Sequence, residues 1–289
     1  MAETVAGAGT DGVATTAAGA VEHVIDSRPE TRREWLRSMW NHRSVLSMLA
    51  RADFHVRYKR AALGVAWAVA VPVIQAGVLA FVFSRVIRVQ STANFGAYVL
   101  GGVLAWSYFS GTIATGATAI VDGSGLTDKV WFPRALLSVV PAIANMVGLS
   151  VSFAVIVVAM PILGADYSIR LLLIPLGILL LVSFTASLAL VLSALHVYFR
   201  DVKFLVQAAL LVWFYVTPIA YPKGLLKSLS SVIDFNPMTG IVSMFQVAVA
   251  GPQPHWGRAV GISVAFTLVL MAVALETHRR HDRLFVDLL

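Results

Sequence analysis

The sequence contains no cysteine, and only 13% of its 289 residues are charged. Without cysteine the chain cannot form a disulfide, a thiolate metal site or a cysteine nucleophile. The apolar fraction of 58% and the low charge exclude an ordinary soluble globular domain. This composition predicts a membrane protein, and at about 20 residues per span the length allows roughly six transmembrane helices.

Motifs that carry chemistry are also missing. The sequence has no G-x-x-x-x-G-K-[ST] nucleotide-binding loop, no H-E-x-x-H pair and no paired-carboxylate motif. We therefore expect no enzyme activity, no metal site and no cofactor in this chain. If ATP drives the protein, ATP and Mg²⁺ bind to a separate subunit.

Charge is scarce inside the apolar runs, which lie at about 64–87, 97–121, 136–160, 171–195, 204–221 and 259–275. Each run is long enough to cross about 30 Å of hydrocarbon as a helix, although the fifth is at the short end. Arg85, Asp122 and Glu276 lie at the ends of runs. Because ion-coupled transporters need ionisable groups within their spans, this pattern weakens a proton-driven reading but leaves it open.

The chain before the first run has two parts. Residues 1–30 are rich in Ala, Gly, Thr and Val, which predicts a disordered cytoplasmic tail, and they lack the pattern of a signal peptide. Residues 31–62 alternate apolar residues at helical spacing with Arg and Lys. That pattern predicts a basic amphipathic interface helix on the membrane surface, with an ordinary solvated helix as the alternative.

The distribution of Lys and Arg predicts the orientation. If both termini are cytoplasmic, sixteen of the 22 basic residues fall on the cytoplasmic side and six on the outer side. The positive-inside rule favours this arrangement. The net charge of +7 then suits anionic lipid headgroups, and we expect no nucleic-acid partner.

Gly and Pro interrupt the stretch at 222–258 before the last run. Its pieces are too short to span, so we expect short helices that dip into the membrane or lie on its outer face. Asn236 and Pro237 are typical of the cap and first turn of such a helix. The predicted fold is an all-α integral membrane protein with about six spans, an N-terminal interface helix and short re-entrant helices before the last span.

Aromatic residues are the remaining candidates for a site. Tyr98, Trp106 and Phe109 fall on one face of the second run, and Trp213 and Tyr215 lie near the end of the fifth. Aromatic faces offer stacking contacts to sugar rings, which makes these five candidates for lining a substrate channel. Helix packing or an interfacial belt is the commoner role for any single ring.

Four segments resemble the permease subunit of ABC-2-type polysaccharide exporters, the family that handles O-antigen, teichoic acid and cell-wall galactan. They are DFHVRYKRAALGVAWAVAVP at 53–72, GLTDKVWFPR at 125–134, the stretch from YFRDVKF to TPIAYP at 198–222, and FNPM at 235–238. The resemblance covers about residue 46 to the C-terminus. It makes 63–289 an ABC-2-type transmembrane domain.

The resemblance implies a homodimer that encloses a channel, with two ATP-binding-cassette ATPase subunits docked on the cytoplasmic side. It implies ATPase contacts along two segments, the helix from Arg32 to Tyr58 and the stretch from Asp128 to Arg134, and in particular at Arg57, Tyr58, Asp128, Lys129, Trp131, Phe132, Pro133 and Arg134. It also implies an outer gate that includes Pro218, Tyr221, Asn236 and Pro237.

These observations predict the transmembrane subunit of an ATP-driven exporter that moves an undecaprenyl-linked polysaccharide, galactan-like or O-antigen-like, across the cytoplasmic membrane. Three alternatives stay open: an ABC-2 exporter of a drug or small lipid, a proton-coupled flippase for lipid-linked glycans, and a structural scaffold. The flippase predicts a functional ionisable group at Asp122, His196 or Glu276. The scaffold predicts that no glycan stimulates a partner ATPase.

Overall fold

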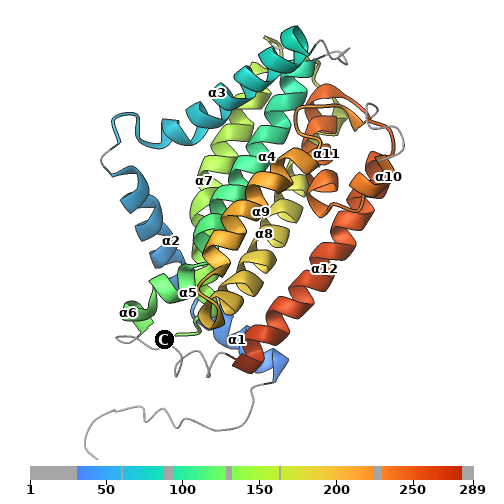
Figure 1. Ribbon diagram of the computed structural model, residues 1–289. Coiled ribbons are helices and arrows are strands. Elements are labelled where there is room, and N and C mark those ends of the chain that lie inside the picture. The colour runs from blue at the N-terminus through green and yellow to red at the C-terminus, as the bar shows by residue number, and fades with distance from the viewer. Residues whose placement is uncertain are drawn as a thin grey trace, which may run out of the picture.

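The computed structural model describes residues 31–59, 61–87, 94–127, 132–162, 164–223 and 230–281. Every regular element within those ranges is a helix. The long helices run side by side and form an elongated bundle (Figure 1). The predicted all-α membrane fold is therefore confirmed, and the tail predicted at residues 1–30 lies outside the described residues.

Five helical segments in the described chain are long and apolar enough to cross a membrane. The first joins a 3₁₀ turn η1 (Gly64–Ala66), α3 (Trp67–Phe81) and a π-helical turn η2 (Val82–Val86), and it is the most exposed. The most buried is α4 (Phe95–Gly116), at the centre of the bundle. The others are α7 (Ala135–Ala159), α8 (Leu173–Tyr198) with its leading 3₁₀ turn η3 (Ile169–Leu172), and α12 (Trp256–His281).

The fifth apolar run forms α9 (Val202–Val216), which contacts α4 and α8. The sequence predicts this run to Tyr221, but the helix stops five residues earlier. Thr217 has an extended conformation, with φ −88° and ψ 130°, because the proline that follows disfavours the helical region. Fifteen residues give α9 a length of about 22 Å, so the rest of this crossing is made by non-helical chain.

The first described helix and the end of the last one lie on the same side of the bundle. Trp35 on α1 (Arg32–Asn41) packs against Ala274 on α12 and Leu190 on α8. An even number of crossings must therefore separate α1 from the end of α12. The five long segments together with α9 provide six.

The predicted interface helix is two helices, α1 and α2 (Arg43–Tyr58), separated at His42. Thr31 and Glu34 form a capping box at the start of α1, with Thr31 N donating to Glu34 Oε2 at 2.9 Å. These bonds lower the pKa of Glu34. The apolar side of the helix pair packs onto the beginning of α7 through Leu46 and Leu49, so protein rather than lipid covers that side.

Short helices occupy both ends of the bundle. At the end where α1 lies are α5 (Ala119–Asp122) and α6 (Ser124–Thr127), between α4 and α7 (Figure 1). Toward the other end are α10 (Ser230–Ile233) and α11 (Pro237–Ala250). Asn236 caps α11 by accepting from Met238 N at 3.0 Å, and Pro237 occupies its first turn, as the sequence predicts.

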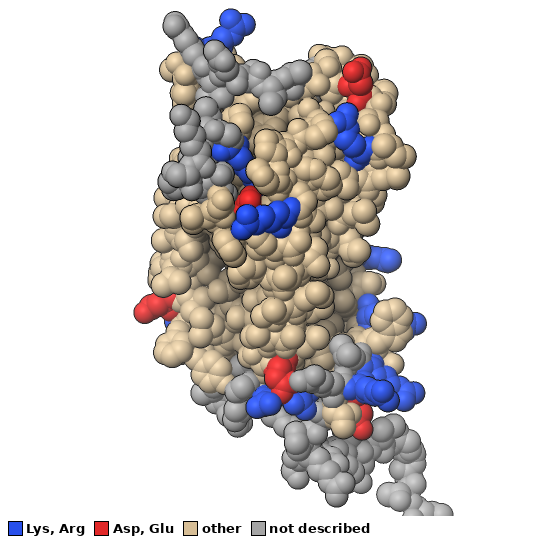
Figure 2. Space-filling model, turned by 90° about the vertical axis from the view of Figure 1, so that its right-hand side faces the viewer, with Lys and Arg blue, Asp and Glu red and all other residues tan. Residues whose placement is uncertain are grey.

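The outer surface is that of a membrane protein. On the face in Figure 2, charged side chains lie over the upper half, at both edges and at the base, and an uncharged area lies in the lower middle. Exposed apolar side chains on α12 include Val264, Phe266, Leu268, Val269 and Val273. This distribution matches helices whose middle lies in hydrocarbon.

Candidate functional site

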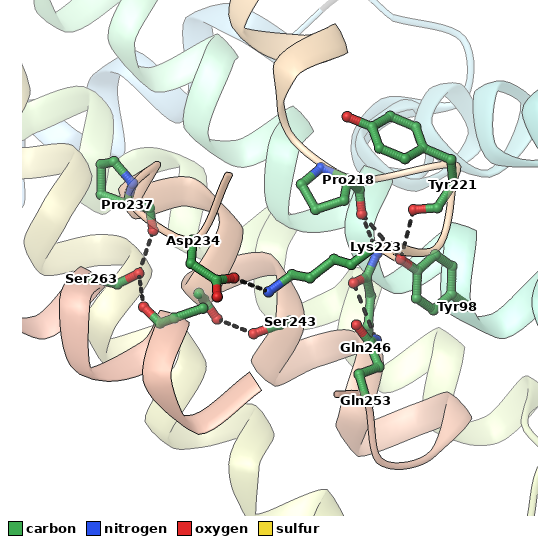
Figure 3. Close-up of polar contacts among 12 residues, drawn as sticks. Tyr98, Pro218, Tyr221, Lys223, Asp234, Pro237, Ser243, Gln246, Gln253 and Ser263 are labelled. Carbon is green, nitrogen blue, oxygen red and sulfur yellow. Dashed lines mark hydrogen bonds and ion pairs between the residues drawn. The ribbon is translucent and has the colours of Figure 1, made fainter. Parts of the chain in front are cut away.

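The loop that follows α9 is bent, non-helical chain held inside the bundle by two buried side chains (Figure 3). Tyr98 Oη on α4 donates to the carbonyl oxygens of Pro218, at 3.2 Å, and Tyr221, at 3.1 Å. Gln246 Nε2 on α11 donates to Pro218 O at 3.0 Å and Ile219 O at 3.3 Å. Irregular backbone at membrane depth is tolerated where protein groups satisfy its polar atoms, and these bonds meet that requirement.

Asn236 joins three elements through one amide group. Its Oδ1 accepts from Trp213 Nε1 on α9 at 2.8 Å, in addition to the cap bond from Met238 N. Its Nδ2 donates to Thr217 Oγ1 at 3.0 Å. The amide thus fixes the end of α9 and the loop against the start of α11.

A buried ion pair also joins the loop to the segment before α11. Lys223 Nζ lies 2.9 Å from Asp234 Oδ1, and each side chain is only 5% exposed. Figure 3 shows the lysine side chain reaching across the cluster to the carboxylate. Because neither charge reaches water, each one depends on the other.

The start of α11 lies unusually close to α12. A Cβ atom at Gly240 would overlap the Ala259 carbonyl oxygen and Ser263 Oγ, so no larger residue fits without moving a helix. Ser263 Oγ also lies 2.5 Å from Pro237 O and 2.9 Å from Ala259 O. The short helix is therefore fixed to the last span at its N-terminal end.

The residues implied as an outer gate lie together in the structure. We use the name outer cluster for Tyr98, Trp213, residues 217–223, residues 234–237, Gly240, Gln246 and Ser263. Pro218, Tyr221, Asn236 and Pro237 all belong to it. Their role in gating stays a prediction.

Sequence reasoning missed Gln246, Lys223 and Asp234. A glutamine within an otherwise apolar helix was an available signal, because a buried amide needs partners. The ion pair gave a weaker signal, since two charges eleven residues apart in a broken segment have no defined geometry.

The aromatic candidates for a channel lining lie mostly inside the protomer. Trp106 and Phe109 pack against each other with ring centroids 5.3 Å apart, and Phe109 lies 5.2 Å from Trp213. Tyr98, Trp106 and Phe109 are at most 5% exposed, whereas Tyr215 is 69% exposed. In this conformation the three buried rings serve helix packing, and a lining role for the five stays a prediction.

At the opposite end, parts of the two segments implied to contact an ATPase touch each other. Phe132 is buried and packs with Leu136 and Leu137 at the start of α7 against Leu46 and Leu49 of α2. Pro133 and Arg134 follow directly, and Arg134 is 8% exposed. Asp128, Lys129 and Trp131 lie outside the described residues, and the ATPase contact itself stays a prediction.

The end of α2 is fastened to two spans by polar side chains. Arg57 Nη1 donates to Asn145 Oδ1 on α7 at 2.7 Å, and Asn145 Nδ2 donates to Thr112 Oγ1 on α4 at 2.9 Å. Arg57 also pairs with Asp53 at 3.0 Å, one turn earlier on α2. Tyr58 is half-buried beside it. A displacement of α2 would act directly on α4 and α7 through these bonds.

The sequence of the chain is similar to those of known proteins. A profile described as ABC-2 type transporter matches residues 44–249. A relative from Myxococcus xanthus named "O-antigen export system permease protein RfbA" is 29% identical over 214 residues, or 73% of this chain and 82% of the relative. Two relatives of the same name from Klebsiella pneumoniae are 28% identical over 200 residues and 26% over 234 residues. They cover 68% and 80% of this chain, and 77% and 90% of their own lengths.

The profile takes in most of α2, the bundle as far as α11, and the greater part of the outer cluster. It covers well over half of the sequence, so the chain belongs to the ABC-2 type transporter family.

Proposed function

We propose that the chain is the transmembrane subunit of an ATP-driven exporter that moves an undecaprenyl-linked polysaccharide across the cytoplasmic membrane. In this proposal two copies enclose the conduit, and two ATP-binding-cassette ATPase subunits dock on its cytoplasmic side. The carrying observation is family membership over residues 44–249, together with three relatives named as O-antigen export permeases.

The orientation follows from the fold and the charge pattern. α1 and the end of α12 share one side of the bundle. The positive-inside rule favours the cytoplasm for that side, since the topology predicted from the sequence assigns it sixteen of the 22 basic residues. We therefore place both termini in the cytoplasm and the outer cluster toward the outer face.

The outer cluster supports a gate for a hydrated polymer. Its loop is held largely by neutral hydrogen bonds from Tyr98, Gln246 and Asn236. Such bonds can be exchanged for bonds to water or sugar hydroxyls at little net cost, because each contributes only about 0.5–1.5 kcal/mol. A wide conduit also avoids stripping water from the many hydroxyls of a glycan.

The opposite end supports coupling to a motor on another chain. α2 packs on the start of α7 and is tied through Arg57 to Asn145. In this proposal, closure of the ATPase pair pushes α2 and the segment at 132–134, and α4 and α7 follow.

The test is reconstitution of the full chain with its partner ATPase in proteoliposomes loaded with an undecaprenyl-linked glycan. The readout is glycan that becomes accessible to a lectin on the outer-leaflet side, measured with and without ATP. We expect translocation only with ATP. The matched control is the same complex with an ATPase that binds but does not hydrolyse ATP, and translocation in that control would overturn the proposal.

The same vesicles separate the alternatives. A proton gradient without ATP drives translocation only if the chain is a proton-coupled flippase. That mechanism also predicts loss of transport when Asp122, His196 or Glu276 is neutralised. Asp122 accepts from Thr118 Oγ1 at 2.6 Å and Glu276 pairs with Arg279 at 2.6 Å, so both carboxylates already have structural partners at span ends.

A further inference from the structure

A cavity of about 210 Å³ lies between the interface helix and the spans. The end of α2 and the first turns of α3 line one side, and α4 and α7 line the other. Trp67 and Val71 on the α3 side are 43% and 54% exposed. Because α3 is the most exposed span, the cavity lies beside an outer face of the single chain.

The cavity is polar at one end and mainly apolar toward the other. Arg57 and Asn145 meet at the polar end, ten residues into α7 from its cytoplasmic start. Leu149 and Ser152 lie further along α7, up to about 10 Å beyond Asn145. Leu104 and Ser107 on the antiparallel α4 lie near them, so the far end has two serine hydroxyls, those of Ser107 and Ser152, among apolar side chains. Because the first turns of α3, where the first span begins, line the cavity, in the proposed orientation the polar end lies at the cytoplasmic end of that span and the apolar end lies toward the bilayer centre.

Arg57 has hydrogen-bonding capacity left over at the polar end. A guanidinium carries five N–H donors, and the described contacts use one on each terminal nitrogen, to Asn145 and Asp53. The side chain is 31% exposed. Guanidinium groups bind phosphate oxygens through two parallel hydrogen bonds, and Lys59, exposed two residues later, adds positive charge nearby.

We propose that this cavity binds one phosphate-headed lipid from the cytoplasmic leaflet. Its phosphate bonds to Arg57 at the polar end, and part of a hydrocarbon chain lies along Leu104 and Leu149 toward the bilayer centre. The volume is several times that needed by a water molecule, and it accommodates a segment of a lipid while the rest stays in the bilayer. The proposal concerns lipid binding; it uses the orientation proposed above and does not depend on the proposed export function.

Two pairs of variants separate cavity binding from general effects. Arg57→Gln removes the phosphate ligand, and Arg51→Gln removes one exposed charge from the same helix outside the cavity. Gly111→Leu fills the cavity and Gly77→Leu is its control. Both glycines are helical and exposed, and a Cβ atom at either meets nothing within 4 Å, but Gly77 does not line the cavity.

The experiment is native mass spectrometry of the purified full chain, titrated in detergent with phosphatidylglycerol, undecaprenyl phosphate or diacylglycerol. We expect one tightly held phosphate lipid per chain in the wild type, Arg51→Gln and Gly77→Leu. Arg57→Gln and Gly111→Leu should weaken that binding by about tenfold or more. Diacylglycerol, which lacks the phosphate, should bind no more tightly to wild type than to Arg57→Gln.

The lipid arms identify the source of the phosphate. Tighter binding of phosphatidylglycerol assigns the site to bulk phospholipid, and tighter binding of undecaprenyl phosphate assigns it to a carrier lipid. Equal retention of both by wild type, Arg57→Gln and Gly111→Leu would overturn the proposal. If Arg57→Gln yields no folded protein, Gly111→Leu against Gly77→Leu decides the question alone.

Discussion

Replacing one partner of the buried ion pair tests how firmly the outer cluster is closed. At 2.9 Å and an effective dielectric constant of about 20, Lys223 and Asp234 attract each other by roughly 6 kcal/mol. Desolvation of two groups that are 95% buried offsets most of that attraction. We therefore expect Lys223→Met or Asp234→Asn alone to destabilise the cluster by about 3–5 kcal/mol, because each leaves an unpaired buried charge or an unmatched partner.

The matched control is the double variant Lys223→Met with Asp234→Leu, which removes both charges. We expect it to be near neutral, since apolar replacement of a complete buried pair often is. The assay is hydrogen exchange of α10 and the start of α11 in detergent, with exchange in α8 as an internal reference. Single variants should raise exchange in the outer segment and leave α8 unchanged.

Two results would refute this reasoning. Single variants that exchange at the wild-type rate would mean that water already solvates both charges. A double variant with exchange as fast as in the single variants would mean that side-chain shape, not charge, holds the segment. In the double-mutant cycle, removal of the second charge would then fail to restore the stability lost with the first.

Three further predictions follow from single contacts. Gly240→Ala should lower the thermal stability of the chain, because the new methyl group overlaps the Ala259 carbonyl, and Gly257→Ala in open space should not. Tyr98→Phe leaves buried carbonyls with one donor fewer and should cost about 1–3 kcal/mol in the same exchange assay. The pKa of Glu34 is lowered from its ordinary value of 4.5 in the folded chain. The cap therefore stabilises α1 fully at pH values above 4.5, and this stabilisation is lost as the pH falls through the lower pKa of the folded state. Glu34→Gln should remove that pH dependence from exchange in the first turn of α1.

Local features of the fold could be read from the sequence. Asn236 followed by Pro237 predicts a helix start, and the structure has the cap bond and the proline in the first turn. Five of the six apolar runs coincide with the five long candidate spans, because hydrocarbon leaves the backbone no other solution than a helix. The fifth apolar run continues to Tyr221, but α9 ends where the sequence has the Thr217-Pro218 break.

Contacts between distant residues could not be read in the same way. Arg57 and Asn145 are 88 residues apart, and nothing in either neighbourhood specifies the other. The aromatic face on α4 was recognised, but not whether Trp106 turns toward a conduit or toward Phe214, which lies 5.6 Å away in the structure. Helical periodicity identifies a face, whereas only the packing of the other helices determines what covers it.

The bonds of the outer cluster also predict which of its parts move together. Lys223, Gln246 and Asn236 tie the loop to the segment at 234–246, and breaking the ion pair is the costliest step among them. Tyr98 joins the loop to α4 by neutral bonds alone, so an opening movement should separate those two.

Because the chain has no cysteine, paired cysteines can test this with a short bismaleimide. Joining positions 223 and 234 should leave ATP-driven transport close to that of the uncrosslinked pair, since both lie within the moving unit. Joining positions 98 and 221 should stop transport, and reduction of a cleavable crosslinker should restore it. Full transport with positions 98 and 221 joined would show that the loop stays on α4 while substrate passes, and the conduit would then have to open elsewhere.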